Sequence, residues 1–315
     1  MLLGAFCLEQ PPLRINFGIY SMYTSKLLKN KFRMILFFLC TILLFCGIMK
    51  SLLGGNIIMK KIIAVLLTLL LVFCVTGCAK KEKVVINRAD DLAGKKIGVQ
   101  AGTTGEWWVT DNVKDATVVS FKTGIDAAMD LMNGNIDAVV LDELPAKEIV
   151  AKNRKLDIVK DKFAREEYAI AIKKGNTELV DSINKTIEKI KSNGDYEYLV
   201  ASFMPIDGQV VIPTDLELTG NKTLKLGTNA AFPPFEYVEG SKIVGFDITM
   251  GQKIAQDAGT KLEVVDMAFD SLIPALASGA IDFIAAGMSV TEERKKNVDF
   301  SVPYFESEQV IIIRK

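Results

Sequence analysis

The feature that most constrains this chain is a pattern of strands and helices that occurs twice. Each copy has an apolar strand, one or two amphipathic helices and a second apolar strand. The first copy places a strand at 96–100, a helix at 124–132 and a strand at 136–141, and the second a strand at 224–228, helices at 245–258 and 271–277, and a strand at 281–285. Gly134 and Gly279 follow corresponding helices, where glycine supplies a left-handed cap. Alternating strands and helices predict two open α/β sheets, whose continuous apolar strands would be parallel and covered on both faces.

Ligands bind open α/β sheets outside the carboxyl ends of the strands. Four turns of this chain stand at such ends, at 100–104, 142–143, 229–235 and 286–294. Two lobes that present these ends to each other would enclose a cleft. A polar stretch with Gly208, Pro213 and Gly220 separates the two copies and predicts a linker.

Composition excludes several kinds of chemistry. The chain has no histidine, so no Ser-His-Asp or Cys-His arrangement and no histidine-ligated metal is possible. All five cysteines precede residue 79, at Cys7, Cys40, Cys46, Cys74 and Cys78, so the rest of the chain has no thiol for a disulfide or a zinc cluster. The 38 basic and 38 acidic residues cancel and offer no nucleic-acid footprint. We expect no metal, no cofactor and no nucleic-acid partner.

The segment 59–78 is typical of a bacterial export signal. Met59-Lys60-Lys61 supplies the positive start, and an apolar run over 62–75 follows. It ends in Val75-Thr76-Gly77-Cys78, which looks like a lipobox. A membrane-spanning helix is the alternative, although the run is shorter than the roughly 20 residues that a span needs. Lipid on Cys78 would anchor the chain in the cell membrane, facing the extracellular or periplasmic side.

Residues 1–58 allow two interpretations. The apolar stretch 34–49 is flanked by basic residues and could be an additional membrane segment. Alternatively, Gly54-Gly55 shortly before Met59 could be a ribosome-binding site read in frame. On that hypothesis residues 1–58 are an over-long gene prediction and not part of the native protein.

Five distinctive runs follow residue 222: Leu226-Gly-Thr-Asn-Ala-Ala-Phe-Pro-Pro-Phe-Glu-Tyr237, Val244-Gly-Phe-Asp-Ile-Thr249, Phe269-Asp-Ser-Leu-Ile-Pro-Ala-Leu276, Ala285-Ala-Gly-Met-Ser-Val-Thr-Glu-Glu-Arg294 and Asn297-Val-Asp-Phe-Ser-Val-Pro-Tyr304. Together they resemble the polar amino-acid-binding proteins that serve ABC importers. The earlier block, from Asp91-Leu-Ala-Gly-Lys-Lys through Asp142, resembles that family's second lobe. The resemblance covers nearly all of 84–315 and implies the periplasmic binding protein type II fold, in which two open-sheet α/β lobes are joined by a hinge. It also implies a protein that captures a polar amino acid in the cleft and delivers it to the transmembrane subunits of an ABC permease.

The order of the two halves departs from the family, in which the Gly-Thr-Asn block comes first. A circular permutation of one protein and a truncated tandem of two proteins are the possible explanations. Cys78 to Lys315 has 238 residues, about one binding protein of this family, and each motif occurs once, which favours permutation. The break is then expected in one of the strands that cross between the lobes, with ends at 84–87 and 310–314. That would leave 167–173 as the only continuous crossing and make the hinge softer.

The predicted organisation follows from these interpretations. It comprises the doubtful head 1–58, a lipoprotein signal peptide at 59–78, lobe 2 at 79–168, a hinge strand and the C-terminal part of lobe 1 at 169–205, a linker at 206–222, and the main part of lobe 1 with a broken hinge strand at 223–315.

The resemblance assigns roles to the cleft residues. Arg294 would grip the ligand carboxylate as a bidentate fork, and Asp142 would accept from the ligand ammonium. Phe232 and Phe269 would be aromatic walls. The remaining predicted site residues contribute backbone groups, hydroxyls or amides around these positions: Ala286, Gly287, Ser289, Thr103, Thr104, Asn229 and Gln100.

Each role has a structural alternative. Arg294 lies in a charge run that could be a solvated helix face, and Asp142 could cap the helix that begins near Pro145. Phe232 and Phe269 could be core residues, and Thr103-Thr104 could be a helix cap. The adjacent Trp107-Trp108 are assigned to lobe packing.

The ligand and the function class also have alternatives. Asn229 stands where relatives that bind basic side chains often have Asp, while Glu236 could reach a cationic side chain or face solvent. Glutamine, arginine and cystine therefore all remain open. The alternatives to a receptor are a dehydratase-like enzyme with Asp142 or Glu143 as its acid or base, and a sensor domain.

Overall fold

A computed structural model describes residues 84–206 and 209–315, which belong to one compact unit of the chain. The predicted head 1–58 and the signal peptide 59–78, with its lipid acceptor Cys78, lie outside the described residues. Within the described ranges, no helix has both the length and the apolar character that crossing a membrane requires.

The first sheet belongs to lobe 2 and has the strand order β2-β1-β3-β13-β4. Its strands are β1 (Lys96–Gln100), β2 (Thr117–Phe121), β3 (Ala138–Asp142), β4 (Leu156–Tyr168) and β13 (Phe305–Arg314). The helices of this lobe are η1 (Ala89–Leu92), α3 (Thr104–Asn112), α4 (Gly124–Asn133) and α5 (Glu143–Lys152). β1 is parallel to β2 and β3, whereas β13 is antiparallel to β3 and β4, so the sheet is mixed.

The second sheet belongs to lobe 1 and has the order β10-β6-β11-β5-β12. Its strands are β5 (Ala171–Lys173), β6 (Thr223–Thr228), β10 (Lys261–Asp266), β11 (Phe283–Ile284) and β12 (Val298–Phe300). The helices are α6 (Thr177–Ser192), α7 (Asp195–Phe203), α8 (Phe246–Asp257), η2 (Phe269–Ser271), α9 (Leu272–Ser278) and α10 (Glu292–Lys295), and a small sheet is formed by β7 (Ala231–Phe232), β8 (Glu236–Glu239) and β9 (Lys242–Val244). Two open α/β sheets were predicted and are confirmed, but both are mixed, because β5 is antiparallel to β11 and β12.

The central strands are buried on both faces, as their continuous apolar sequences predict. In β3, Val139 and Leu141 pack into one hydrophobic cluster together with residues of α4 and α5. The alternate residues Ala138 and Val140 pack into a second cluster, together with Val109 of α3. The strand period of two therefore sends successive side chains into separate cores.

The two copies of the sequence pattern fold in the same way. Asp137 accepts a hydrogen bond from the backbone amide of Lys96 at 2.9 Å, and Asp282 accepts one from the amide of Lys225 at 2.7 Å. Asp137 thus lies just before β3 and binds the backbone of β1, and Asp282 lies just before β11 and binds the backbone of β6. This contact explains why β3 begins at Ala138, later than predicted from the apolar run.

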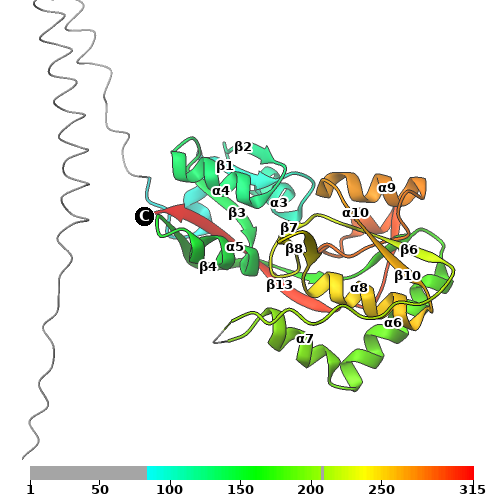
Figure 1. Cartoon of the computed structure of the whole chain (residues 1–315). Coiled ribbons are helices and arrows are strands. Elements are labelled where there is room, and N and C mark those ends of the chain that lie inside the picture. Colours follow the sequence, from blue (N-terminus) through cyan, green and yellow to red (C-terminus); the bar gives the residue numbers. More distant parts are fainter. Residues whose placement is uncertain (1–83, 207–208) are drawn as a thin grey trace, which may run out of the picture. The chain divides into compact units, whose positions relative to one another are not determined.

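The chain crosses between the lobes twice, which corrects the expectation of a single continuous crossing. One crossing joins β4 to β5, and the other joins β12 to β13. Figure 1 labels β4 and β13, the strands of lobe 2 at which the two crossings meet that lobe. β13 is not a broken end: it pairs with β4 from Phe305↔Tyr168 to Arg314↔Leu156. Its apolar residues Val310, Ile311 and Ile312 are buried, because β13 lies between β3 and β4. The expected softening of the hinge therefore loses its structural basis.

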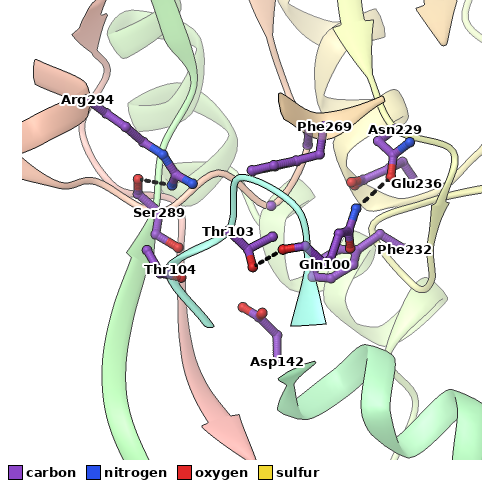
Figure 2. A pocket seen from close by; sticks show the side chains of 12 residues that line it. Gln100, Thr103, Thr104, Asp142, Asn229, Phe232, Glu236, Phe269, Ser289 and Arg294 are labelled. Atoms are coloured by element: carbon purple, nitrogen blue, oxygen red, sulfur yellow. Dashed lines mark hydrogen bonds between the residues drawn. The ribbon is translucent and has the colours of Figure 1, made fainter. Parts of the chain in front are cut away.

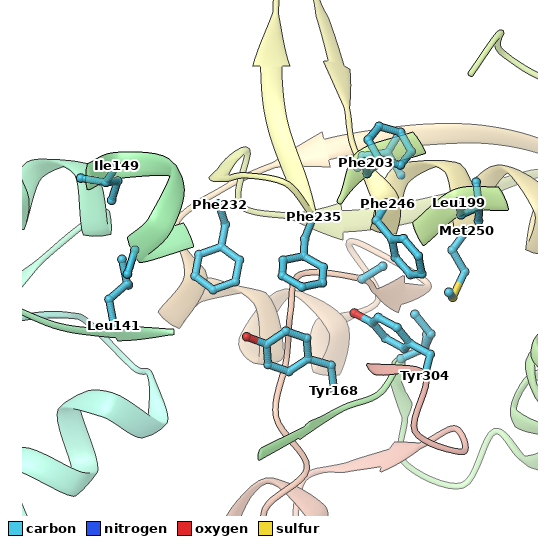
Figure 3. Packing of buried hydrophobic residues seen from close by; sticks show 14 of the residues in the cluster. Leu141, Ile149, Tyr168, Leu199, Phe203, Phe232, Phe235, Phe246, Met250 and Tyr304 are labelled. Atoms are coloured by element: carbon cyan, nitrogen blue, oxygen red, sulfur yellow. The ribbon is translucent and has the colours of Figure 1, made fainter. Parts of the chain in front are cut away.

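Aromatic side chains pack where the lobes meet (Figure 3). The rings of Tyr168 and Phe235 meet edge to face with centroids 5.2 Å apart, and Phe246 stacks with Tyr304 at 6.0 Å. Phe232 stacks on Phe235 at 6.0 Å. Tyr168 is the last residue of β4, so this cluster holds one crossing segment in place.

Gly245 offers a stability prediction. Its φ is +137°, and a Cβ there would lie 2.1 Å from the carbonyl oxygen of Phe235. We expect Gly245→Ala to lower the free energy of unfolding by about 2–4 kcal/mol, because the backbone would have to move. Gly240→Ala is the control: its φ is +62° but a Cβ there meets nothing within 4 Å, so about 1 kcal/mol is expected. Urea denaturation measures both, and equal losses would contradict the steric argument.

Candidate functional site

A pocket lies between the two lobes, near the carboxyl ends of the strands (Figure 2). It is lined by Gln100, Thr103, Thr104, Asp142, Asn229, Phe232, Glu236, Phe269, Ala286, Gly287, Ser289 and Arg294. All the predicted site residues are in this set, together with Glu236; that they bind a ligand stays a prediction. The cavity has a volume of only about 10 Å³, so entry of a ligand requires the lobes or the side chains to move.

Lobe 2 contributes the end of β1 and the start of α3. Thr103 caps α3, because its Oγ1 accepts from the Glu106 amide at 3.3 Å, and the same hydroxyl donates to the Gln100 carbonyl at 2.7 Å. Thr103 therefore both caps α3 and lines the pocket. Gln100 Nε2 donates to Asn229 Oδ1 at 2.9 Å, a hydrogen bond between the lobes, and Asn229 Nδ2 donates to the Met267 carbonyl.

Arg294 is the cation of the pocket, and the alternative of a solvated helix face is wrong because only 3% of the residue is exposed. Its guanidinium donates to the carbonyls of Ser289 at 2.7 Å and of Gly102 at 3.0 Å. It lies over the rings of Trp107 and Phe269, at 5.0 and 5.3 Å from their centroids. Burial lowers the pKa of Arg294 to about 10, so it remains charged at neutral pH.

Asp142 ends β3, and its side chain does not cap α5, although it occupies the position before the helix. Its carboxylate instead accepts from the Tyr168 hydroxyl and from Gln309 Nε2, the latter at 2.8 Å, with Ser307 at 3.5 Å. Burial, followed by the negative charge of Glu166, raises the pKa of Asp142 to about 7. A cationic group in the pocket would relieve both effects.

This raised pKa predicts how binding depends on pH. Below about pH 7 Asp142 becomes protonated and can no longer attract an ammonium group, so affinity for an amino acid should fall by up to about tenfold per pH unit. Titration calorimetry between pH 5 and pH 8 measures this, with Asp142→Asn as the variant whose affinity depends less steeply on pH, because Glu236 then remains as the pocket carboxyl with a raised pKa. For stability the sign is opposite: a raised pKa stabilises the folded state at low pH, and that contribution is lost as pH rises through about 7. An affinity that stays constant across this range would contradict the assignment.

Glu236 was predicted either to reach a cation or to face solvent, and the second alternative is wrong. It is fully buried, and no N–H or hydroxyl donor among the described residues bonds to either carboxyl oxygen, although the carboxyl of Asp247 lies close enough to share a proton with it. Burial, and then the nearby charge of Asp247, hold its pKa well above the usual range. Asp247 was missed by the sequence interpretation; it accepts from the Gly287 amide at 2.8 Å and the Tyr304 hydroxyl at 2.7 Å. Asp247 follows Phe246 in a predicted helix, and nothing in that sequence pattern indicates that the aspartate is buried.

Phe232 and Phe269 both line the pocket, and that they contact a ligand stays a prediction. Phe232 is 8% exposed and belongs to the hydrophobic core, yet it also lines the pocket. Gly287 lies against it: φ is +52° there, and a Cβ would lie 2.7 Å from the Phe232 ring. Phe269 lines the pocket and contacts the Arg294 guanidinium.

The arrangement suits a zwitterion with a polar or charged side chain. Figure 2 shows Arg294 and Ser289 on one side, Asn229 and Glu236 on the other, and Asp142 apart from both pairs. A carboxylate fits the guanidinium and an ammonium fits Asp142. Burial away from water strengthens both interactions.

Residues 224–315 match the bacterial extracellular solute-binding proteins, family 3. The arginine-binding extracellular protein ArtP of Bacillus subtilis is 47% identical over 97 residues, which are 31% of this chain and 38% of that protein. A probable histidine-binding protein of Campylobacter jejuni is 44% identical over 90 residues, or 29% and 35%. The L-cystine-binding protein TcyJ of Escherichia coli is 34% identical over 129 residues, or 41% and 48%. In each case the matched part is less than half of the relative's length.

Proposed function

We propose that this chain is an extracytoplasmic amino-acid receptor of an ABC importer, because residues 224–315 match the bacterial extracellular solute-binding proteins, family 3. The amino acid is captured between the lobes, and the closed form delivers it to the permease. The family is one of binding proteins, which favours capture over turnover and leaves the dehydratase-like alternative without support from the match.

One observation carries the proposal: among the described residues, a buried guanidinium with donors that no protein group uses faces a pocket that also holds a buried carboxylate. The two hydrogen bonds of Arg294 to backbone carbonyls use only part of the five N–H donors of a guanidinium. The others are available for a ligand carboxylate. Asp142 has the charge and the burial to accept the ligand ammonium.

Glu236 favours an amino acid with a cationic side chain. Its buried oxygens lack N–H or hydroxyl donors among the described residues, and such groups are costly unless a ligand satisfies them. A ligand cation would supply both the donors and the compensating charge. Relatives named for arginine and histidine fit this class, whereas the relative named for cystine keeps a neutral side chain open.

A thermal-shift screen of the full chain in detergent tests the function. The panel is the twenty amino acids with cystine and ornithine. Binding to the folded state alone stabilises by about 2.7 kcal/mol at a hundredfold excess over Kd, and arginine, lysine or ornithine should give the largest shift. A folded protein that no member stabilises would overturn the receptor proposal.

The order of the halves is proposed to be a circular permutation. Its support is that residues 84–206 and 209–315 build two five-stranded sheets whose lobes line a shared pocket, with each family motif present once. A permuted receptor should be a monomer that binds one amino acid per chain. Light scattering combined with titration calorimetry tests this, and a ligand-binding dimer of half-sites would favour the truncated tandem.

Anchoring through Cys78 is also a proposal. It rests on the small-small-Cys ending of the apolar run. The variant Cys78→Ala should lose incorporation of labelled palmitate in bacterial cells. Mass spectrometry of the mature protein would show at the same time whether peptides from 1–58 exist.

A further inference from the structure

Trp107 contacts the pocket cation without lining the pocket. It lies in α3 of lobe 2 and is half-buried. The Arg294 guanidinium, which belongs to α10 of lobe 1, lies 5.0 Å from the centroid of its ring. The contact therefore joins residues of different lobes.

Arg294 is bound from both lobes in the same way. Lobe 1 supplies the Ser289 carbonyl and the Phe269 ring, and lobe 2 supplies the Gly102 carbonyl and the Trp107 ring. Any separation of the lobes must break the second pair. The position and the hydration of the guanidinium thus depend on whether the lobes are together.

A tryptophan ring is well suited to this contact. Its face is the strongest cation-binding surface among the aromatic side chains, and the attraction grows when water is excluded. A guanidinium can pack on an aromatic face and keep N–H donors for a carboxylate. The ring therefore both covers Arg294 and restricts its orientation.

We propose that Trp107 is a positioning residue of the amino-acid site, which covers the Arg294 guanidinium from lobe 2 as the lobes close. The inference rests on the proposed receptor function and deepens it. Trp107 acts on the ligand through Arg294, and it couples capture of the ligand carboxylate to lobe closure.

Trp108, the next residue of α3, provides a matched control. Its ring packs 4.2 Å from that of Phe163 and belongs to the hydrophobic cluster of η1, β1 and α3. Both tryptophans were predicted to serve lobe packing. That role fits Trp108, whereas Trp107 contacts the opposite lobe.

Binding to the full chain in detergent tests the proposal, with the panel member that the wild type binds most tightly as the probe. Trp107→Leu should raise Kd roughly tenfold, since an apolar side chain without a ring gives no cation–π attraction. Trp107→Phe should recover most of that loss, because it restores an aromatic face. Trp108→Phe should leave Kd within about twofold, because Trp108 does not reach the pocket cation.

Fluorescence supplies a readout that a purely structural residue would not change. The chain has only these two tryptophans, so Trp108→Phe leaves Trp107 as the sole emitter and Trp107→Phe leaves Trp108. The probe should shift the emission of Trp107 and leave that of Trp108 unchanged.

The outcomes separate this inference from the receptor proposal. Wild-type protein that binds no panel member contradicts the receptor function and removes the basis for a role of Trp107. Wild-type protein that binds, with an unchanged Kd in Trp107→Leu or an emission of Trp107 that does not respond to the probe, overturns the positioning role alone.

Discussion

Replacing Arg294 by alanine is expected to weaken amino-acid binding by about thirtyfold to a few thousandfold. The guanidinium is buried and has N–H donors to spare for a carboxylate. Removing one partner of a buried, hydrogen-bonded charge pair costs about 2–5 kcal/mol, and each 1.4 kcal/mol is a factor of about ten. Titration calorimetry of wild type and Arg294→Ala measures the difference.

Two further variants make this result specific. Arg294→Lys keeps the charge but not the planar fork, so its affinity should lie between those of wild type and Arg294→Ala. Lys296→Ala removes an exposed cation of the same segment, paired with Glu293, and should bind like wild type. If Arg294→Ala binds as tightly as Lys296→Ala, the carboxylate grip is assigned to the wrong residue.

Glu236→Gln is expected to reduce affinity for arginine by roughly a hundredfold while the ligand-free protein becomes no less stable. The loss arises because an amide cannot balance the charge of a guanidinium held away from water. The stability follows from the raised pKa: the buried carboxyl destabilises the folded state at pH 7, where it would otherwise be ionised. Calorimetry and thermal denaturation measure the two quantities.

The matched control is Glu239→Gln, in the same strand β8 but exposed, which should change neither quantity. Arginine binding should also release protons, because a nearby cation lowers the raised pKa of Glu236. Titrations in buffers of different ionisation enthalpy detect that release. Unchanged arginine affinity in Glu236→Gln would exclude Glu236 as the partner of the ligand side chain and leave a neutral ligand as the better hypothesis.

Much of the fold was predictable because its elements have strong local signals. β1 was predicted at its observed bounds, and the glycines at 134 and 279 do have left-handed backbones at the ends of α4 and α9. The antiparallel insertion of β13 was not predictable, since its apolar residues look the same whatever the direction of the neighbouring strands. The place of β13 between β3 and β4 depends on contacts between segments that are far apart in the sequence.

Some features of the site were also predictable from the sequence, and others were not. Sequence motifs predicted which residues meet in the pocket, because turns at strand ends converge in open sheets. They could not predict that single charged side chains are buried. Glu236 and Asp247 are charged residues, which are usually exposed, and they become buried only when other segments of the chain pack around them. The contact between Trp107 and Arg294 was equally hidden, because it joins helices that the sequence separates by most of the chain.

The central place of β13 in the sheet of lobe 2 has a consequence for synthesis on the ribosome. β3 and β4 emerge early, but the strand that joins them emerges only after the whole of lobe 1 has been translated. Until then two apolar strand edges lack their partner, and such edges invite pairing with other chains. The nascent protein therefore cannot finish one lobe before beginning the next, and the long sequence separation of these contacts slows folding. An exported protein with this arrangement would benefit from staying unfolded until translation and secretion are complete.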